Sequence, residues 1–127
     1  MKDLIISIVI VAILISGWFV FFNYSENTIH SYTACIKEEI IPLIEKDRWE
    51  QGYKKMSELE DQWHDFRRLA LYFLDTETIN EIDYSIAKAS KYVKAKDISN
   101  SSGELNAVIE QLRFLSQNDE LTLNNIL

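Results

Sequence analysis

The hydrophobic pattern of this chain changes character after residue 22. Residues 4–22 contain no charged side chain and consist mainly of Leu, Ile, Val and Phe. At about 1.5 Å per residue, a helix of this length spans about 28 Å, close to the ~30 Å hydrocarbon core of a bilayer. A cleaved signal peptide is the alternative, but its apolar core is only about 7–15 residues long and precedes small residues. Because this run ends in Trp18 and three phenylalanines, we expect an uncleaved anchor in residues 1–24.

Beyond the anchor, apolar residues recur at alternating intervals of three and four, the periodicity of helices that pack along a seam. The series are Trp49, Gly52, Met56, Leu59, Trp63, Phe66, Ala70 and Phe73; Ile29, Tyr32, Ile36, Ile40 and Leu43; Ile79, Ile82, Ile86, Ala89 and Val93; and Leu105, Val108, Leu112 and Leu115. Three glycines and one proline leave little material for the tight turns of β-structure. The pattern therefore predicts four helices after the anchor.

Short connections make consecutive helices antiparallel. We therefore predict an all-α fold, in which an N-terminal transmembrane helix is followed by an up-down antiparallel four-helix bundle in residues 25–127. The expected bundle helices lie at about 26–45, 48–74, 77–96 and 102–117, with a short docked tail at 119–127.

Polar residues mark the expected helix starts. The capping pairs, whose side chains satisfy free backbone N–H groups, are Asp47 with Glu50, Ser101 with Glu104, and Thr78 with Glu81 or an earlier cap at Asp75 or Thr76. Pro42 should kink or end the first bundle helix, because a proline disfavours α geometry in the residue before it. No glycine or proline lies between the anchor and that helix, so the two can form one helix of roughly forty residues.

The charges indicate both the partners and the orientation. Residues 23–127 carry twelve basic and nineteen acidic side chains, which accounts for the whole net charge of −7. Such an acidic domain is a poor candidate for binding nucleic acid or lying on anionic lipid. Lys2 and the α-amine, partly offset by Asp3, precede the apolar run, and no Lys or Arg follows it until Lys37. The positive-inside rule therefore places the N-terminus in the cytoplasm and the bundle outside the cell membrane.

The sequence offers no recognisable catalytic or metal-binding pattern. Each histidine has a carboxylate one turn before it, Glu26 before His30 and Glu60 before His64, but a closed zinc site needs four ligands. Cys35 adjoins a seam residue and is interpreted as a small apolar filler, with an intermolecular disulfide or a free thiol as the alternatives. No nucleophile elbow, zinc-protease, P-loop or dinucleotide motif occurs. We therefore expect no enzyme activity, no cofactor and no bound metal.

Aromatic and apolar side chains outside the seams are the candidates for a partner surface. They are Tyr53, Tyr72, Leu121, Leu123, Ile126 and Leu127. Leaving the apolar tail side chains in water would forgo about 1.5–3 kcal/mol for each one that burial could recover. The tail should therefore either dock on its own bundle or bind a partner.

Four features of the sequence recur together in one known family. They are the N-terminal anchor, the tryptophan-bearing seam helix, the triplets Glu-Ile-Asp and Ser-Ile-Ala at residues 81–83 and 85–87, and the ending Leu-Thr-Leu-Asn-Asn-Ile-Leu at residues 121–127. With these features the chain resembles the bacterial family known as domain of unknown function 4363. The resemblance spans nearly the whole chain. The resemblance implies a small anchored protein of Gram-positive, often spore-forming bacteria. It also implies that some members of the family accompany a multi-pass membrane protein of the YetF type. The family has no assigned activity, so it transfers no functional residues.

Two functions remain open. The first is a membrane-anchored extracytoplasmic interaction module, an accessory subunit that binds lipid through residues 4–22 and contacts an envelope membrane protein, for which the resemblance implies the YetF type. The alternative is a small-ligand sensing bundle, similar to the external domains of bacterial chemoreceptors. Because this sequence shows a single span, such a sensor would have to signal through another subunit.

Overall fold

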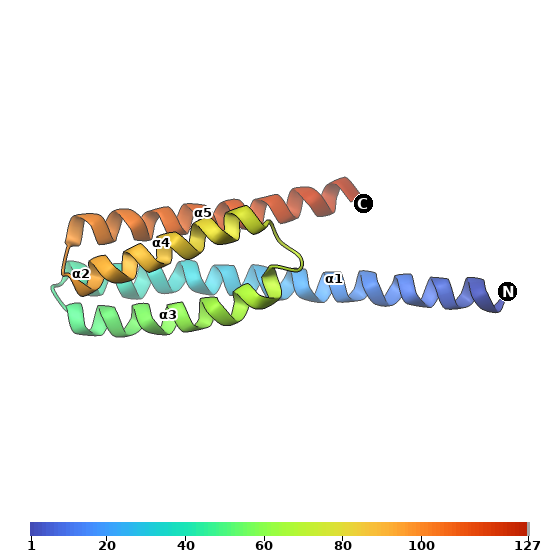
Figure 1. Cartoon of the computed structure of the whole chain (residues 1–127), viewed down its shortest axis with the longest axis horizontal. Coiled ribbons are helices and arrows are strands. Elements are labelled where there is room, and N and C mark those ends of the chain that lie inside the picture. Colours follow the sequence, from blue (N-terminus) through green and yellow to red (C-terminus); the bar gives the residue numbers. More distant parts are fainter. Residues whose placement is uncertain (127) are drawn as a thin grey trace.

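The computed structural model describes the backbone of residues 1–126 and the side chains of residues 1–117. Its elements are α1 (Lys2–Cys35), a single π-helical turn η1 (Ile36–Ile40), α2 (Ile41–Glu45), α3 (Trp49–Ala70), α4 (Thr76–Lys94) and α5 (Ile98–Ile126). The described residues form helices and turns and no strand, which confirms the all-α prediction. Figure 1 shows a bundle at one end of the molecule and the first half of α1 projecting from it.

The first helix is continuous from the apolar run into the bundle. α1, η1 and α2 follow one another without a break from Lys2 to Glu45, 44 residues in all, which confirms that no interruption separates the run from the first bundle helix. This helix is long and apolar enough to cross a membrane, and only 6% of its most apolar stretch is buried in the structure. Apolar side chains between residues 4 and 15 lie exposed all around it. The core helix of a soluble domain would instead be mostly covered.

Pro42 changes the helix without ending it. The turn just before it, η1, is π-helical, and the helix continues through Pro42 to Glu45. A proline ring within a regular α-helix would clash with the carbonyl four residues earlier. The π turn, whose hydrogen bonds span five residues, is wider than an α-helical turn and accommodates the proline here. The wider turn also shifts the buried stripe: Ile40 is followed by Ile44, which is 1% exposed, whereas the predicted Leu43 is half-buried.

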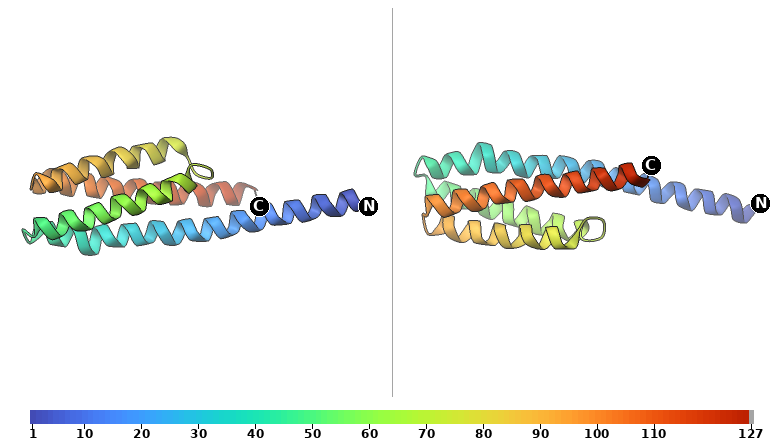
Figure 2. Two further views of the ribbon diagram at one scale, coloured as in Figure 1. Left: turned by 60° about the horizontal axis from the view of Figure 1, so that its bottom comes forward. Right: turned by 90° about the horizontal axis from the view of Figure 1, so that it is seen from above.

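The second half of the long helix forms the bundle with α3, α4 and α5. Consecutive helices run in opposite directions, and α5 returns beside α1, as the two views of Figure 2 and the contacts between these helices agree. Most of the buried apolar residues belong to the four predicted seams; those that do not are Phe21, Ile44, Leu74 and Ile109. Trp49, at the start of α3, and Phe73, in the turn after it, are half-buried. The seam pattern therefore predicted most of the core.

Aromatic and polar contacts join the helices within this core. Tyr32 packs edge-on against Trp63 and Phe66, and its hydroxyl donates to the Gln62 carbonyl at 2.9 Å. Burial of this hydroxyl, with smaller effects of neighbouring groups, raises the pKa of Tyr32 above its usual range. The Trp63 indole N–H donates to Asp83 Oδ1 at 2.9 Å, which links α3 to α4. The polar atoms of the seam aromatics thus select specific partners on neighbouring helices.

The predicted caps are correct for α4 and wrong for α3. The Asp75 carboxylate accepts the Thr78 backbone N–H at 3.1 Å, so the earlier of the expected caps is the one used. α3 instead begins after Arg48, whose side chain makes no capping hydrogen bond. Asp47 does not cap α3: its backbone is left-handed, with φ of 65°, and its carboxylate accepts the Trp49 indole N–H at 2.6 Å.

The predicted start and end of the last helix are also corrected. α5 begins at Ile98, because the Asp97 carboxylate accepts the Asn100 backbone N–H at 3.1 Å and replaces the expected cap at Ser101, which is buried. α5 then continues to Ile126, so residues 119–126 extend the helix and do not form a separate tail. Its sequence contains no glycine or proline after residue 103 that would stop it. The side chains of residues 118–126 and the whole of Leu127 lie outside the described residues, so docking of the tail stays a prediction.

Gly52 allows α3 to approach the end of the first helix closely. A Cβ atom at this position would lie 2.9 Å from Cγ2 of Ile44. Ile44 is β-branched and fully buried, so it has little freedom to move away. Gly103 on α5 has nothing within 4 Å of the same imaginary atom. Gly52 and Gly103 therefore provide a matched pair of helical glycines, one closely packed and one with open space beside it.

We predict opposite effects of alanine at these two positions. Gly52→Ala forces overpacking worth about 1–3 kcal/mol, only partly offset by the gain in helix propensity, so unfolding should become easier by about 1 kcal/mol. Gly103→Ala should stabilise the protein by about 0.5–1 kcal/mol through helix propensity alone. Far-UV circular dichroism during denaturation of the full chain in mild detergent measures both. Equal stabilisation by both substitutions would mean that α3 and α2 are farther apart than described.

Candidate interaction surfaces

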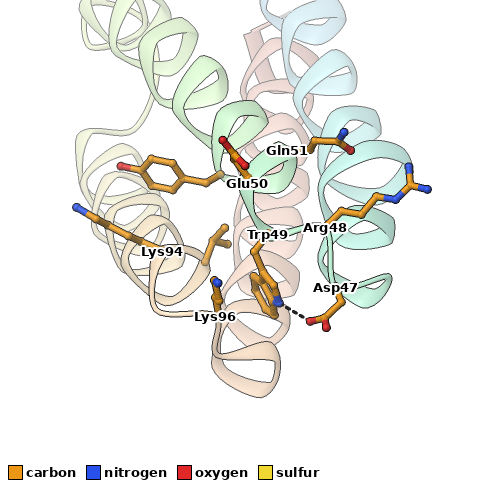
Figure 3. Close-up of a pocket in the computed structure, with 9 residues that line it drawn as sticks. Asp47, Arg48, Trp49, Glu50, Gln51, Lys94 and Lys96 are labelled. Carbon is orange, nitrogen blue, oxygen red and sulfur yellow. Dashed lines mark hydrogen bonds between the residues drawn. The ribbon is translucent and has the colours of Figure 1, made fainter.

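A hollow of about 590 Å³ opens at the end of the bundle that is remote from residue 1. We call it the distal hollow (Figure 3). Two turns far apart in the sequence form it, the one between α2 and α3 and the one between α4 and α5. Its lining residues are Asp47, Arg48, Trp49, Glu50, Gln51, Tyr53, Val93, Lys94 and Lys96.

Both turns contain a non-glycine residue in the left-handed conformation. These residues are Asp47, with φ of 65°, and Lys96, with φ of 59°. Each ends a helix in a Schellman-type turn: the Arg48 N–H donates to the Leu43 carbonyl at 2.9 Å, and the Asp97 N–H to the Tyr92 carbonyl at 3.0 Å. Glycine usually occupies such a position, because a Cβ atom there costs about 1 kcal/mol or more. Both strained residues line the distal hollow.

Aromatic side chains line part of the hollow. Trp49 is half-buried, and its indole N–H is held by the Asp47 carboxylate. Tyr53, one turn later on α3, is 36% exposed. Figure 3 shows the Trp49 ring lying between Asp47 and Lys96 at the mouth of the hollow. The hollow therefore offers ordered aromatic surface of the kind that is enriched at protein interfaces.

The charges of the hollow differ in sign from those of the whole protein. Arg48, Lys94 and Lys96 outnumber the acidic Asp47 and Glu50 among the lining residues, although the chain carries a net charge of −7. The lining contains no Ser, Cys or His that could act as a nucleophile or general base at neutral pH. The excess of cations in the lining favours an anionic group as the occupant.

The structure separates the residues that we predicted as one partner surface. Tyr53 lies in the distal hollow, whereas Tyr72 lies in the turn between α3 and α4 at the opposite end of the bundle, where it is 84% exposed. The two tyrosines therefore cannot contact one partner patch together. Leu121, Leu123 and Ile126 have side chains outside the described part, as does all of Leu127.

Sequence reasoning missed most of the hollow and two exposed aromatic residues of α4 and α5. Tyr84 is 68% exposed and Phe114 is 53% exposed. Helical periodicity could have found Tyr84, since it lies between the seam residues Ile82 and Ile86 and must face away from them. No local signal could have joined Trp49 to Lys96, because only the fold brings their two turns together.

The candidate metal and thiol residues are dispersed. His30 and His64 are both exposed, and no group of three or more potential ligands occurs among the described residues. Cys35 is a half-buried free thiol that lines a second, shallow hollow with Glu39, Lys55 and Glu58. Burial, followed by the hydrogen bond to Glu39 and the negative charges of Glu39 and Glu58, raises the pKa of Cys35 to about 11 despite the opposing charge of Lys55.

Cys35 should therefore react slowly at neutral pH. Only the thiolate is alkylated, so its rate with iodoacetamide should rise about tenfold per pH unit above pH 7 and show no plateau below about pH 10. Replacing Glu39→Gln removes a negative charge beside the sulfur and should move the midpoint to lower pH. A cysteine placed at exposed position 84 in a Cys35→Ala background is the control. A midpoint near the ordinary value of about 8.5 for Cys35 would contradict the described burial.

Comparison with known proteins identifies the family. No curated protein and no solved structure matches the chain. The model of the family described as a domain of unknown function, DUF4363, matches residues 19–126. The match begins near the end of the apolar run and includes every helix of the bundle. The chain therefore belongs to the DUF4363 family.

Proposed function

We propose that this protein is a membrane-anchored interaction module, an accessory subunit whose bundle holds another envelope membrane protein. The exposed first half of α1 carries this proposal. Ten of its Leu, Ile and Val side chains between residues 4 and 15 are each at least half exposed, and in water they would form an apolar surface far larger than soluble monomers carry. A bilayer satisfies this surface without any further protein.

The same helix determines where the bundle is presented. From residue 22 to the end of α2 at residue 45 the helix rises about 35 Å, so the distal hollow lies at about that height above the anchor. Lys2 before the apolar run and the lack of basic residues between it and Lys37 favour an extracytoplasmic bundle. A partner that reaches the distal hollow then needs an extramembrane part, and a YetF-type membrane protein is the partner that the family resemblance suggests.

The second candidate function is small-ligand sensing. The volume of the distal hollow, about 590 Å³, falls within the range of about 300–1,000 Å³ usual for ligand sites. Its mixed, charged lining is less typical, since most such sites are largely apolar. The hollow suits a charged protein segment better than a small apolar molecule.

The topology can be tested with fusions to the C-terminus. With an extracytoplasmic bundle, a C-terminal alkaline phosphatase should be active, and a C-terminal GFP exported by the same route should be dark. Mass spectrometry of the purified chain should find Met1 at its start. A fluorescent GFP fusion would contradict the extracytoplasmic orientation of the bundle. A purified chain that starts near Gly17 would contradict the uncleaved anchor.

The partner contact can be tested with a variant that should be more stable than the native chain. Lys96→Gly relieves the left-handed strain, so it should raise the free energy of unfolding by about 1 kcal/mol, while it removes a cation from the hollow. If the hollow binds the partner, co-purification of that membrane protein from solubilised membranes should fall about tenfold with Lys96→Gly, and also with Tyr53→Ala.

The matched control is Tyr84→Ala, which removes an exposed aromatic side chain outside the hollow. It should retain the same partner as the native chain, as quantified by mass spectrometry. Equal recovery of every membrane protein by all four chains would refute the hollow as the contact. Loss of recovery with Tyr84→Ala alone would place the contact on α4.

A further inference from the structure

The turns at the two ends of the bundle have opposite composition. At the distal end the helices are joined through Lys46, Asp47 and Arg48 and through Lys96 and Asp97. At the other end, six consecutive apolar residues, 69–74, lead through the turn between α3 and α4. Turns in water are usually built from polar residues, glycine and proline, so a turn made of apolar residues, of which Leu69 and Tyr72 are exposed, requires an explanation.

The apolar turn is fixed to α1 at the level where the apolar run ends. Phe73 stacks on Phe21 with ring centroids 4.2 Å apart and meets Trp18 edge-on at 5.7 Å. Phe21 is 7% exposed as a result. In Figure 1 this turn is the part of α3 and α4 that reaches farthest along α1 toward residue 1. The turn cannot move away from the end of the span without breaking these aromatic contacts.

Apolar and aromatic side chains remain uncovered at this level beside the polar Asn23, Arg68 and Asp75. Tyr72 is 84% exposed, Leu69 is 44% exposed, and on α1 Phe19 and Val20 are 42% and 70% exposed. We call these four residues the membrane-side rim. The seam aromatics beside them are covered by one another, whereas the rim has no cover in the described part of the chain.

The backbone of the turn is suited to a medium poor in water. The N–H groups of residues 71–74 all donate to carbonyls within the chain, at 2.8–3.2 Å. A turn with free N–H groups would be costly to remove from water, since an unpaired backbone group loses its solvation there. The N–H groups of this turn carry no such cost.

We propose that the turn between α3 and α4 lies in the headgroup region of the bilayer and is a second lipid contact of the bundle, beside the span. The inference rests on the proposed anchoring of α1. If residues 4–22 fill the hydrocarbon core, Trp18 and Phe21 lie within about 6 Å of its edge. Phe73 and the rim share that level. Tyrosine and tryptophan concentrate there, with the ring toward the acyl chains and the polar atom toward water.

The same geometry selects lipid over a protein as the occupant. Any molecule that covers the rim must lie beside the last turns of the span. The end of α5 also reaches this level (Figure 1), and the rest of that level around a membrane helix is filled by phospholipid. Arg68, exposed on the last turn of α3, can extend its guanidinium toward a headgroup phosphate. The bundle is thereby held upright at two points, so that its distal hollow faces away from the surface.

Site-directed spin labels test this placement in the full chain. In a Cys35→Ala background, single cysteines at residues 10, 72 and 84 receive a nitroxide, and each protein is reconstituted in vesicles of phosphatidylcholine with phosphatidylglycerol. Electron paramagnetic resonance then compares collisions with oxygen, which partitions into lipid, and with a water-soluble nickel chelate. Tyr72 and Tyr84 are both highly exposed in the protein, so neither label disturbs packing and the two differ only in level.

The proposal requires that the label at residue 72 collide with nickel about fivefold less often than the label at 84, because the headgroup region excludes the chelate. The label at residue 10 should be deeper still. Equal nickel accessibility at 72 and 84, with residue 10 protected, would refute the second contact and leave the anchor intact. Nickel accessibility at residue 10 as well would refute the anchor and this inference with it.

Discussion

The continuity of one helix from residue 2 to residue 45 is the constraint on which the rest of the structure depends. A helix satisfies its own backbone hydrogen bonds, so it can pass from lipid to water without a change of conformation. Because α1 is also a member of the bundle, its direction determines the direction of α3, α4 and α5. Even Pro42 is accommodated by a π turn and not by a break.

With the anchor that we propose, this constraint places the two ends of the bundle in different environments, and the chemistry of the two ends does differ. The near end carries an apolar turn with paired backbone N–H groups and an aromatic contact to α1. The distal end carries charged turns, two residues in left-handed conformation and a hollow. Strain therefore occurs only at the end where we propose partner binding, among the described residues. Strained conformations often persist where a side chain is needed for function.

The sequence predicted the core better than the sites, for a physical reason. Burial of residues such as Trp63 and Ile82 follows from a period that is repeated many times along a helix. The buried face is therefore assigned correctly even where a single position departs from the pattern. A cap depends on one residue: Asp75 was predicted correctly, but Asp47 was not, because its carboxylate binds the Trp49 indole instead of the helix start. The distal hollow depends on two turns that approach each other only in the folded chain, so no periodicity reveals it. Tyr53 was identified because it lies off its seam, and its neighbour Lys96 was not.

Electrostatics helps to explain why the apolar contacts must hold the bundle in place. With a net charge of −7, the bundle is repelled by anionic lipid, and that repulsion acts over a Debye length of about 8 Å at physiological salt. In the placement that we propose, the near end lies within this range, so its attachment comes from the span and the apolar membrane-side rim. The distal hollow, about 35 Å higher, lies several Debye lengths away. Its local excess of cations is therefore unaffected by the membrane, and an anionic segment of a partner meets it without competition from lipid headgroups.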